Sequence, residues 1–169
     1  MRRLDAARFS DCYAVRHLNA EDAGAVLELY QSNPLFFRAG HQAPTMDHVR
    51  RDMALLPPEV EPERKYFVGL CDGDTLTAVL DLIDGYPTPD TAYLGLFMVH
   101  GAASGQGRGS GIVTRLCQAL GAAGFSALRL AYDKDNPQSS HFWQKNGFAA
   151  LYETDSPEYG HLIVAERRL

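Results

Sequence analysis

Residues 106–111, with the sequence QGRGSG, have the composition of an anion-binding turn. The apolar run ending at Met98-Val99 predicts a strand before them, and apolar residues at helical spacing from Ile112 to Ala123 predict a helix after them. Glycines at such a turn let several backbone N–H groups point at one place, where the positive end of the helix dipole adds to them. This pattern predicts a cradle for a pyrophosphate group.

Two better-known glycine-rich loops are excluded. A dinucleotide-binding fingerprint needs three glycines at fixed spacing, and residues 105–114 never provide the third. A nucleoside triphosphate loop closes with Lys followed by Ser or Thr, a pair that is missing from this stretch. A flexible glycine-rich linker remains as an alternative, but the helix predicted directly after the glycines argues against it.

A second informative stretch covers residues 136–148. Asn136 is a natural N-cap, Pro137 suits the first helical position, and Asn146-Gly147 is typical of a left-handed helix stop. These signals predict one short helix, and a surface helix capped for stability would explain all of them. It would not explain the aromatic pair Phe142-Trp143.

Together the two stretches resemble the GNAT superfamily of acyl-CoA-dependent N-acetyltransferases. That family's phosphate motif is Gln or Arg, two residues, Gly, one residue, then Gly or Ala; its later motif runs from Asn through a small residue and Phe-Tyr to Lys and Gly-Phe. Trp143 stands where the family usually has Tyr. The resemblance is close from about Ala92 to Phe148 and looser before, and the connection from Val99 to Gln106 is unusually long. The matching residues are Gln106, Gly109 and Gly111, then Asn136, Ser139, Phe142, Lys145, Gly147 and Phe148.

The resemblance implies an α/β (α+β) fold in which residues 1–169 form a single GNAT-like domain. Its mixed, twisted sheet would have six to seven strands with helices on both faces. Acetyl-CoA, as co-substrate and without a metal, would lie where the strands ending at Val99 and near Tyr132 splay apart. The implied cofactor-binding residues are Phe97, Met98 and Val99 along the pantetheine arm, Gln106, Gly107, Arg108, Gly109, Ser110 and Gly111 at the pyrophosphate, Asn136 and Ser139 beside the pantetheine, and Phe142 and Trp143 as a wall. For Phe142, an ordinary core position is equally compatible.

The implied reaction is transfer of an acetyl group to the primary amine of a small molecule or amino-acid derivative, with a protein or peptide acceptor as a variant. An alkylammonium with a pKa near 10.4 is only about 0.04% neutral at pH 7, so direct attack needs a base or a water chain. No carboxylate lies between Ala92 and Val99. The nearest candidates are Asp81, Asp84 and Asp90. Solvated loop charges are the simpler interpretation of the last two, whereas Asp81 interrupts an apolar run and is the candidate catalytic residue.

The leaving group raises a further question, because the family's Tyr commonly protonates the departing thiolate. An indole has no proton to donate at a useful pKa, so Trp143 is excluded as a general acid. Either the thiolate leaves unassisted or the proton comes from Ser139, Ser140 or Tyr132. Trp143 and the missing central-strand carboxylate also motivate an alternative function, an acyl-CoA-binding regulatory module of the same fold with little or no turnover.

The acceptor pocket is expected in two loops, residues 35–38 and 84–87. The aromatic residues Phe36, Phe37, Tyr86 and Tyr93 would form a wall for an amine-bearing metabolite or, equally, the surface of a homodimer.

Composition is compatible with a single cytoplasmic domain. The chain has 169 residues, 46% of them hydrophobic, which suffices for one sizeable core. A net charge of −5 argues against a nucleic-acid partner and mildly favours a cationic substrate. No apolar run approaches membrane-spanning length, so no membrane partner is expected. Cys12, Cys71 and Cys117 form no metal-ligand pattern and indicate reduced thiols.

Periodicity and turn signals predict alternating strands and helices along the chain. Strands are expected over residues 13–18, 66–71, 76–83, 92–99, 128–132, 148–152 and 162–166, the fourth of them buried on both faces. Helices are expected after Asn19, after Thr45, over residues 112–123 and after Asn136.

Overall fold

A computed structural model describes residues 4–34 and 43–169 of the chain. In these residues seven strands form one sheet in the order β1-β2-β3-β4-β5-β7-β6. Only the β4–β5 pair is parallel among the described pairings; the others are antiparallel. The mixed sheet expected from the sequence is therefore confirmed. Its strands are β1 (Ala14–His17), β2 (Lys65–Asp72), β3 (Thr75–Ile83), β4 (Thr91–Val99), β5 (Ala127–Asp133), β6 (Ala149–Ser156) and β7 (Gly160–Arg168).

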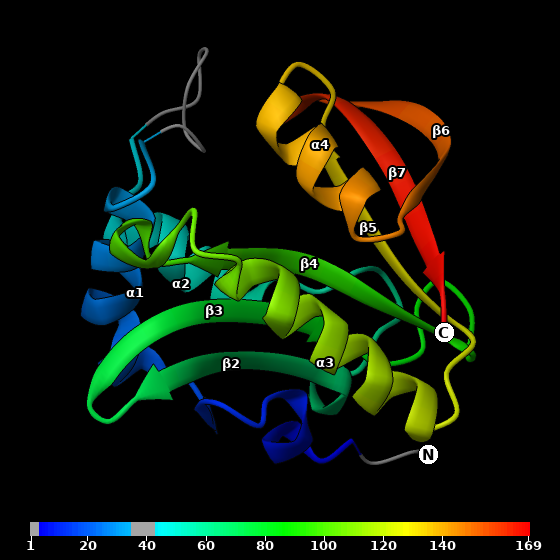
Figure 1. Cartoon of the computed structure of the whole chain (residues 1–169). Helices are drawn as coiled ribbons and strands as arrows, with labels where there is room; N and C mark the ends of the chain where they lie inside the picture. The colour runs from blue at the N-terminus through cyan, green and yellow to red at the C-terminus, as the bar shows by residue number, and fades with distance from the viewer. Residues whose placement is uncertain (1–3, 35–42) are drawn as a thin grey trace.

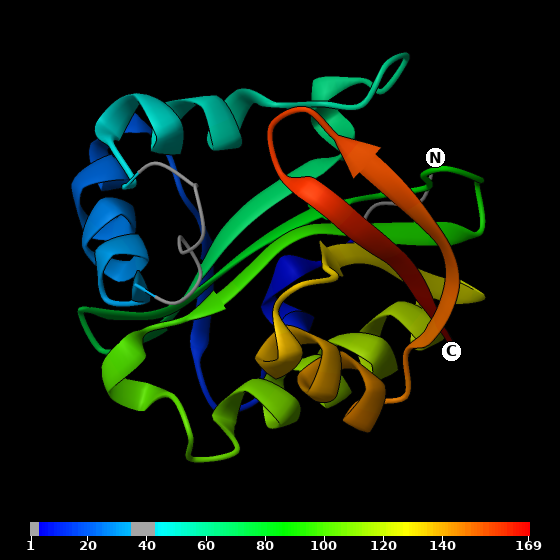
Figure 2. The same cartoon turned by 90° about the horizontal axis from the view of Figure 1, so that it is seen from above.

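Helices cover both faces of the sheet, as Figure 2 shows from above. α1 (Ala23–Gln31) and α2 (Met46–Ala54) lie on one face, and α3 (Arg108–Ala122) and α4 (Pro137–Lys145) lie on the other. The Thr45 hydroxyl accepts a hydrogen bond from the backbone N–H of His48 at 3.2 Å, which confirms Thr45 as the cap of α2. Asn19 caps a short 3₁₀ turn that leads into α1 rather than α1 itself.

Alternation along the strands divides the core into two layers. On the face under α1 and α2, Val26 and Val49 pack with Val79 and Met98. On the other face, the leucines of β3 and β4 pack with those of α3: Leu80, Leu82, Leu94, Leu116 and Leu120. Because neighbouring residues of a strand point to opposite faces, Asp81 lies on the side of α1 and α2 with Val79.

The sheet opens between its two parallel strands. β4 and β5 pair only over Thr91–Leu94 and Ala127–Leu130. At that point Asp81 pairs with Leu96 and Leu82 pairs with Leu94, so that Gly95 is the extra residue of a β-bulge. A bulge bends its strand and increases the local twist. Beyond it β4 and β5 diverge (Figure 1).

Three expectations need correction. Residues 92–99 are not buried on both faces throughout, because Gly95 is exposed and Phe97 and Val99 are partly exposed where β4 leaves β5. Asp84 is buried, with 7% of its surface exposed, rather than a solvated loop charge. The last two strands have eight and nine residues and extend beyond the expected 148–152 and 162–166, since an exposed antiparallel hairpin needs no continuous apolar pattern.

Of the helices within residues 4–34 and 43–169, none is long and apolar enough to cross a membrane.

Candidate functional site

A cleft of about 1380 Å³ opens where β4 and β5 diverge. Its walls come from the ends of these two strands, from the turn before α3, from α4, and from α1 and α2 on the opposite side. Pockets for small-molecule ligands typically measure roughly 300–1000 Å³, so this larger cleft has room for a long cofactor and a second molecule. We call its α3–α4 side the cofactor half and its α1–α2 side the acceptor half.

The cofactor half contains an open helix N-terminus. Gly107 precedes α3 in the left-handed conformation, with φ of +73°, and no described side chain caps the helix. The backbone N–H groups of Arg108, Gly109 and Ser110 have no acceptor inside a helix that begins there. These donors and the helix dipole make a site for an anionic group at the edge of the cleft.

A glycine brings the two predicted motifs into contact. A Cβ added at Gly109 would lie 3.2 Å from Cε2 of Phe142, so the missing side chain lets α4 pack closely against the first turn of α3. The buried Asn146 joins the same two helices, because its Nδ2 donates to Ser110 Oγ at 3.2 Å and to the carbonyl of Phe142 at 2.8 Å. In the sequence Asn146 had signalled a helix stop alone.

Asn136, the first residue of the second motif, can both cap α4 and donate a hydrogen bond to a ligand. The Asn136 side-chain oxygen accepts from the N–H groups of Gln138 and Ser139 at 3.1 and 3.2 Å, as its predicted capping role requires. Because the cap uses the oxygen, the side-chain amide remains a donor for a ligand. Asn136 and Ser139 both line the cleft.

Aromatic rings form the inner wall of the cofactor half. The Trp143 ring lies edge-on to Phe97, Phe142 and Phe148, with centroids 6.0, 4.8 and 5.1 Å away. Only 8% of Trp143 is exposed, yet it lines the cleft, so it belongs to the wall and the core together. Phe142 is less buried and stacks on Phe97 at 6.3 Å.

The end of β4 is held by the end of α1, a contact that the sequence did not indicate. The Asn33 Nδ2 donates to the carbonyl of Val99 at 2.9 Å, and the N–H of Gly101 donates to Ser32 Oγ at 2.8 Å. A Cβ at Gly101 would collide with the carbonyl of Ser32. One lone pair of the Val99 carbonyl is therefore already occupied at the strand edge expected to meet the pantetheine.

Most of the predicted cofactor-binding residues meet at the cleft. The exceptions are Gln106, in the turn before α3, and Arg108 and Gly111, in the first turn of α3; all three are exposed and do not line the cleft. Tyr132 lines the cleft and Ser140 does not. The lining residues are Phe97, Met98, Val99, Gly107, Gly109, Ser110, Asn136, Ser139, Phe142 and Trp143.

Asp81 lies in the acceptor half beside the β4 bulge. Its Oδ2 forms an ion pair with Lys65 Nζ at 2.8 Å, and both side chains are about nine-tenths buried. Its Oδ1 is buried and has no hydrogen-bond partner among the described residues. Burial raises the pKa of Asp81 to about 6, although the charge of Lys65 acts in the opposite direction. This carboxylate can therefore accept a proton near neutral pH.

The expected aromatic acceptor wall is present only in part. Tyr93 lines the cleft and meets Tyr86 edge-on at 5.6 Å, but Tyr86 does not line it. Phe36 and Phe37, with the whole expected loop of residues 35–38, lie outside the described residues. Neither Asp84 nor Asp90 reaches the cleft.

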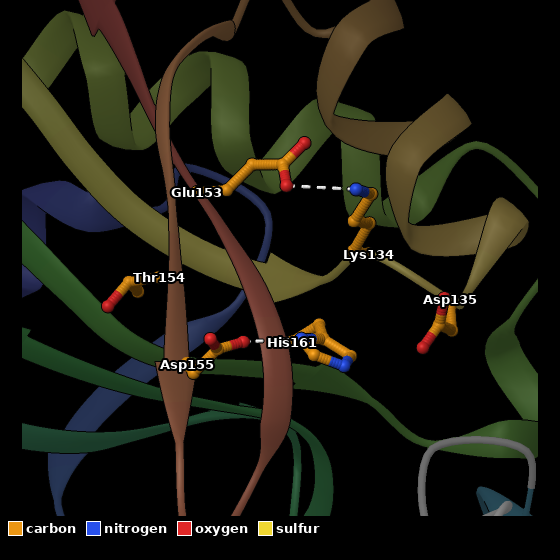
Figure 3. Close-up of a pocket in the computed structure, with 6 residues that line it drawn as sticks. All are labelled: Lys134, Asp135, Glu153, Thr154, Asp155 and His161. Carbon is orange, nitrogen blue, oxygen red and sulfur yellow. Dashed lines mark hydrogen bonds and ion pairs between the residues drawn. The ribbon is translucent and has the colours of Figure 1, made fainter.

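A second hollow, of about 320 Å³, lies between the end of β5 and the β6–β7 hairpin. Lys134 Nζ contacts Glu153 Oε2 at 2.8 Å, and His161 forms an ion pair with Asp155 (Figure 3). None of its six lining residues also lines the larger cleft. Four of the six form two ion pairs with one another, and these side chains are exposed to solvent, so we assign no chemistry to this hollow.

The Lys65–Asp81 pair predicts a pH-dependent loss of stability. Lys65→Met keeps the aliphatic stem but leaves Asp81 buried without its cation, which costs about 3–5 kcal/mol when the carboxyl is ionised. Because the pKa of Asp81 is higher in the folded protein than in the unfolded chain, its protonation stabilises the folded state at pH values below the unfolded pKa. This contribution is lost as the pH rises through the folded pKa. The loss should therefore be larger at about pH 8 than at about pH 4.5, measured by urea unfolding.

Lys134→Met is the matched control, because Lys134 pairs with an exposed Glu153. It should change stability little at either pH. Equal losses for Lys65→Met at both pH values would contradict an ionised Asp81 that depends on Lys65.

Solved structures that are similar to this one include acetyltransferases. An acetyltransferase from Thermus thermophilus has a TM-score of 0.75 and 28% identity, covering 92% of this chain and 96% of its own. The ribosomal-protein-S18-alanine N-acetyltransferase from Escherichia coli has a TM-score of 0.65 and 16% identity, covering 92% of each chain. PaiA N-acetyltransferase from Thermoplasma acidophilum, in complex with coenzyme A, has a TM-score of 0.63 and 16% identity, covering 92% of this chain and 98% of its own.

Curated proteins offer no match to the chain. The profile of the Acetyltransferase (GNAT) family matches residues 26–148, well over half of the sequence, and includes both motifs. The resemblance first indicated by those motifs is thereby confirmed, and the chain belongs to the acetyltransferase (GNAT) family.

Proposed function

We propose that this protein transfers the acetyl group of acetyl-CoA to the primary amine of a small molecule or amino-acid derivative. The observation that carries the proposal is the uncapped N-terminus of α3, opening onto a cleft between diverging strands. Its amides suit the pyrophosphate of CoA, and the Asn136 amide lies farther along the same cleft. The coenzyme A complex of the Thermoplasma acidophilum neighbour is consistent with this assignment.

The acceptor half supplies a proton acceptor for the amine. An ammonium bound in the acceptor half would lie beside the Asp81 carboxylate, which lines the cleft. The ammonium first gives one proton to the Asp81 carboxylate and becomes a neutral amine. Its lone pair then attacks the thioester carbonyl and the C–S bond breaks, and the second amine proton reaches the departing CoA thiolate through a neighbouring hydroxyl. A carboxyl with a pKa of about 6 accepts the first proton more readily than an ordinary aspartate would.

Of the donors proposed from the sequence, Tyr132 and Ser139 line the cleft and are our candidates to protonate the departing thiolate. Trp143 supplies no proton, so its contribution is to hold the reacting groups in place.

The alternative function, a CoA-binding module with little turnover, is favoured by one observation. The buried Trp143 occupies the position of the family's usual phenol. Release of CoA thiol, followed across a panel of primary amines, separates the two functions. Amine-dependent release supports the transferase, and CoA binding without release for every amine supports the module.

If the amides at the start of α3 bind the pyrophosphate, acetyl-CoA affinity should fall when a side chain is introduced at Gly109. Gly109→Val would push a branched side chain into the Phe142 ring and displace the amides, so acetyl-CoA should bind at least tenfold more weakly, about 1.4 kcal/mol. Gly111→Ala is the control, because no atom lies within 4 Å of a Cβ placed there. Isothermal titration calorimetry measures both. Equal affinity for wild type and Gly109→Val would remove the cradle assignment.

The assigned base predicts a pH profile. Wild-type kcat/KM should fall below about pH 6 as Asp81 takes up a proton, in addition to the effect of amine ionisation. Asp81→Asn should lower turnover about a hundredfold, abolish that step of the profile and leave acetyl-CoA affinity intact. Asp90→Asn, at an exposed position outside the cleft, is the control. Unchanged kinetics in Asp81→Asn would reduce Asp81 to a structural residue.

A substitution at Trp143 distinguishes a packing role in the aromatic wall from the loss of a general acid at this position. Trp143→Tyr removes part of a ring that contacts three other aromatic rings, so acetyl-CoA should bind more weakly and turnover should stay flat or fall. Steady-state kinetics at saturating acetyl-CoA measure this. A clear rise in turnover with unchanged cofactor affinity would instead show that a phenol was lacking.

A further inference from the structure

The acceptor half contains a second carboxylate, at the C-terminal end of α2. The Tyr30 hydroxyl on α1 donates to Asp52 Oδ2 at 2.9 Å, and both residues line the cleft together with Asp81. Only 15% of the Asp52 side chain is exposed. Tyr30 is 1% exposed and packs in the core between the helices, so its hydroxyl holds the carboxylate in a defined position.

The two carboxylates share one electrostatic environment. Burial raises the pKa of Tyr30, and the charges of Asp52 and Asp81 raise it further. Burial is the largest cause of the raised pKa of Asp81, and the charge of Asp52 adds to the rise. Asp52 and Asp81 are therefore close enough to repel each other, and a positive charge between or beside them would relieve that repulsion.

The described residues leave Asp52 with a weaker cation than Asp81. Asp81 has Lys65 at 2.8 Å, whereas the nearest basic nitrogen recorded for Asp52 is Nε2 of His48, at 3.9 Å. Arg51, the adjacent residue, forms an ion pair with Glu158 of the β6–β7 turn. Burial raises the pKa of Asp52, and the Tyr30 hydrogen bond and the charges of His48, Arg51 and Lys65 offset this rise only in part. No Lys or Arg within residues 4–34 and 43–169 forms an ion pair with Asp52.

A reacting amine alone does not match this arrangement. To attack the thioester, the nitrogen at Asp81 must be neutral, and a neutral amine gains little from a carboxylate. A second nitrogen that stays protonated would keep the acceptor bound while the first loses its proton. Asp81 also points to a ligand in the acceptor half, because this residue lines the cleft at only 8% exposure while its Oδ1 lacks a hydrogen-bond partner among the described residues.

Building on the proposed function, we propose that Asp52, held by Tyr30, binds a second cationic nitrogen of the acceptor, which makes the substrate a short diamine. In this arrangement one amine lies at Asp81 and reacts, and the other ammonium remains paired with Asp52. The acceptor's length is limited, because beyond Asp52 the Arg51–Glu158 ion pair joins α2 to the β6–β7 turn. A longer chain would have to displace it.

The test compares straight-chain diamines of three to six carbon atoms with the monoamines of equal length, each titrated calorimetrically into the protein saturated with CoA. Wild type should bind the best diamine at least tenfold more tightly than its monoamine. Asp52→Asn should abolish that preference, measured as the ratio of the two affinities. The control is Glu28→Gln on the neighbouring helix α1, where the side chain is exposed and does not line the cleft, so the preference should persist.

The ratio of diamine to monoamine affinity decides between a binding role and a structural role for Asp52. A structural role for Asp52 would weaken diamine and monoamine binding alike and leave their ratio unchanged, which would overturn the proposal. Equal affinities of wild type for diamines and monoamines would overturn it as well. Thiol release, followed in parallel with acetyl-CoA, reports separately on the proposed function: a diamine preference without release supports the Asp52 site while contradicting acetyl transfer.

Discussion

The divergence of β4 from β5 at the Gly95 bulge is the constraint on which the other features of the site depend. Two parallel strands that paired along their full length would place side chains where the cleft now lies. Because pairing stops at Leu94, the edge of β4 from Gly95 to Val99 is exposed to the cleft. The same bulge lies opposite Asp81, so a single irregularity opens the cofactor half and shapes the acceptor half.

Two opposite electrostatic environments meet in this cleft. At one side, the amides of the α3 N-terminus present partial positive charge to an anion. At the other side, Asp81 and Asp52 present carboxylates to a cation. The Phe97, Phe142 and Trp143 rings lie along the wall of the cofactor half. A polar anionic cofactor and a cationic acceptor would thus approach one another from opposite sides of the sheet's opening.

The cofactor half was largely predictable because its function depends on backbone geometry. A turn that offers several amides requires glycines, and a capped short helix requires Asn, Pro and a terminal Gly, so both leave local signals in the sequence. The acceptor half left fewer. Asp81 could be suspected from one polar residue in an apolar run, but Asp52 resembles any acidic residue on an amphipathic helix, and Asn33 resembles a helix end. Their roles depend on partners 22 and 66 residues away in the chain.

The sequence by itself therefore determined the family, the order of strands and helices, and the position of the glycine-rich turn before α3, because each follows from residue types at short, fixed spacing. Tertiary structure alone decided where β4 and β5 separate, that Gly109 receives Phe142, and that Asp84 is buried away from the cleft while Asp81 and Asp52 face it. The physical reason is that burial, strand register and charge pairing arise between segments distant in the chain, and no local pattern records them.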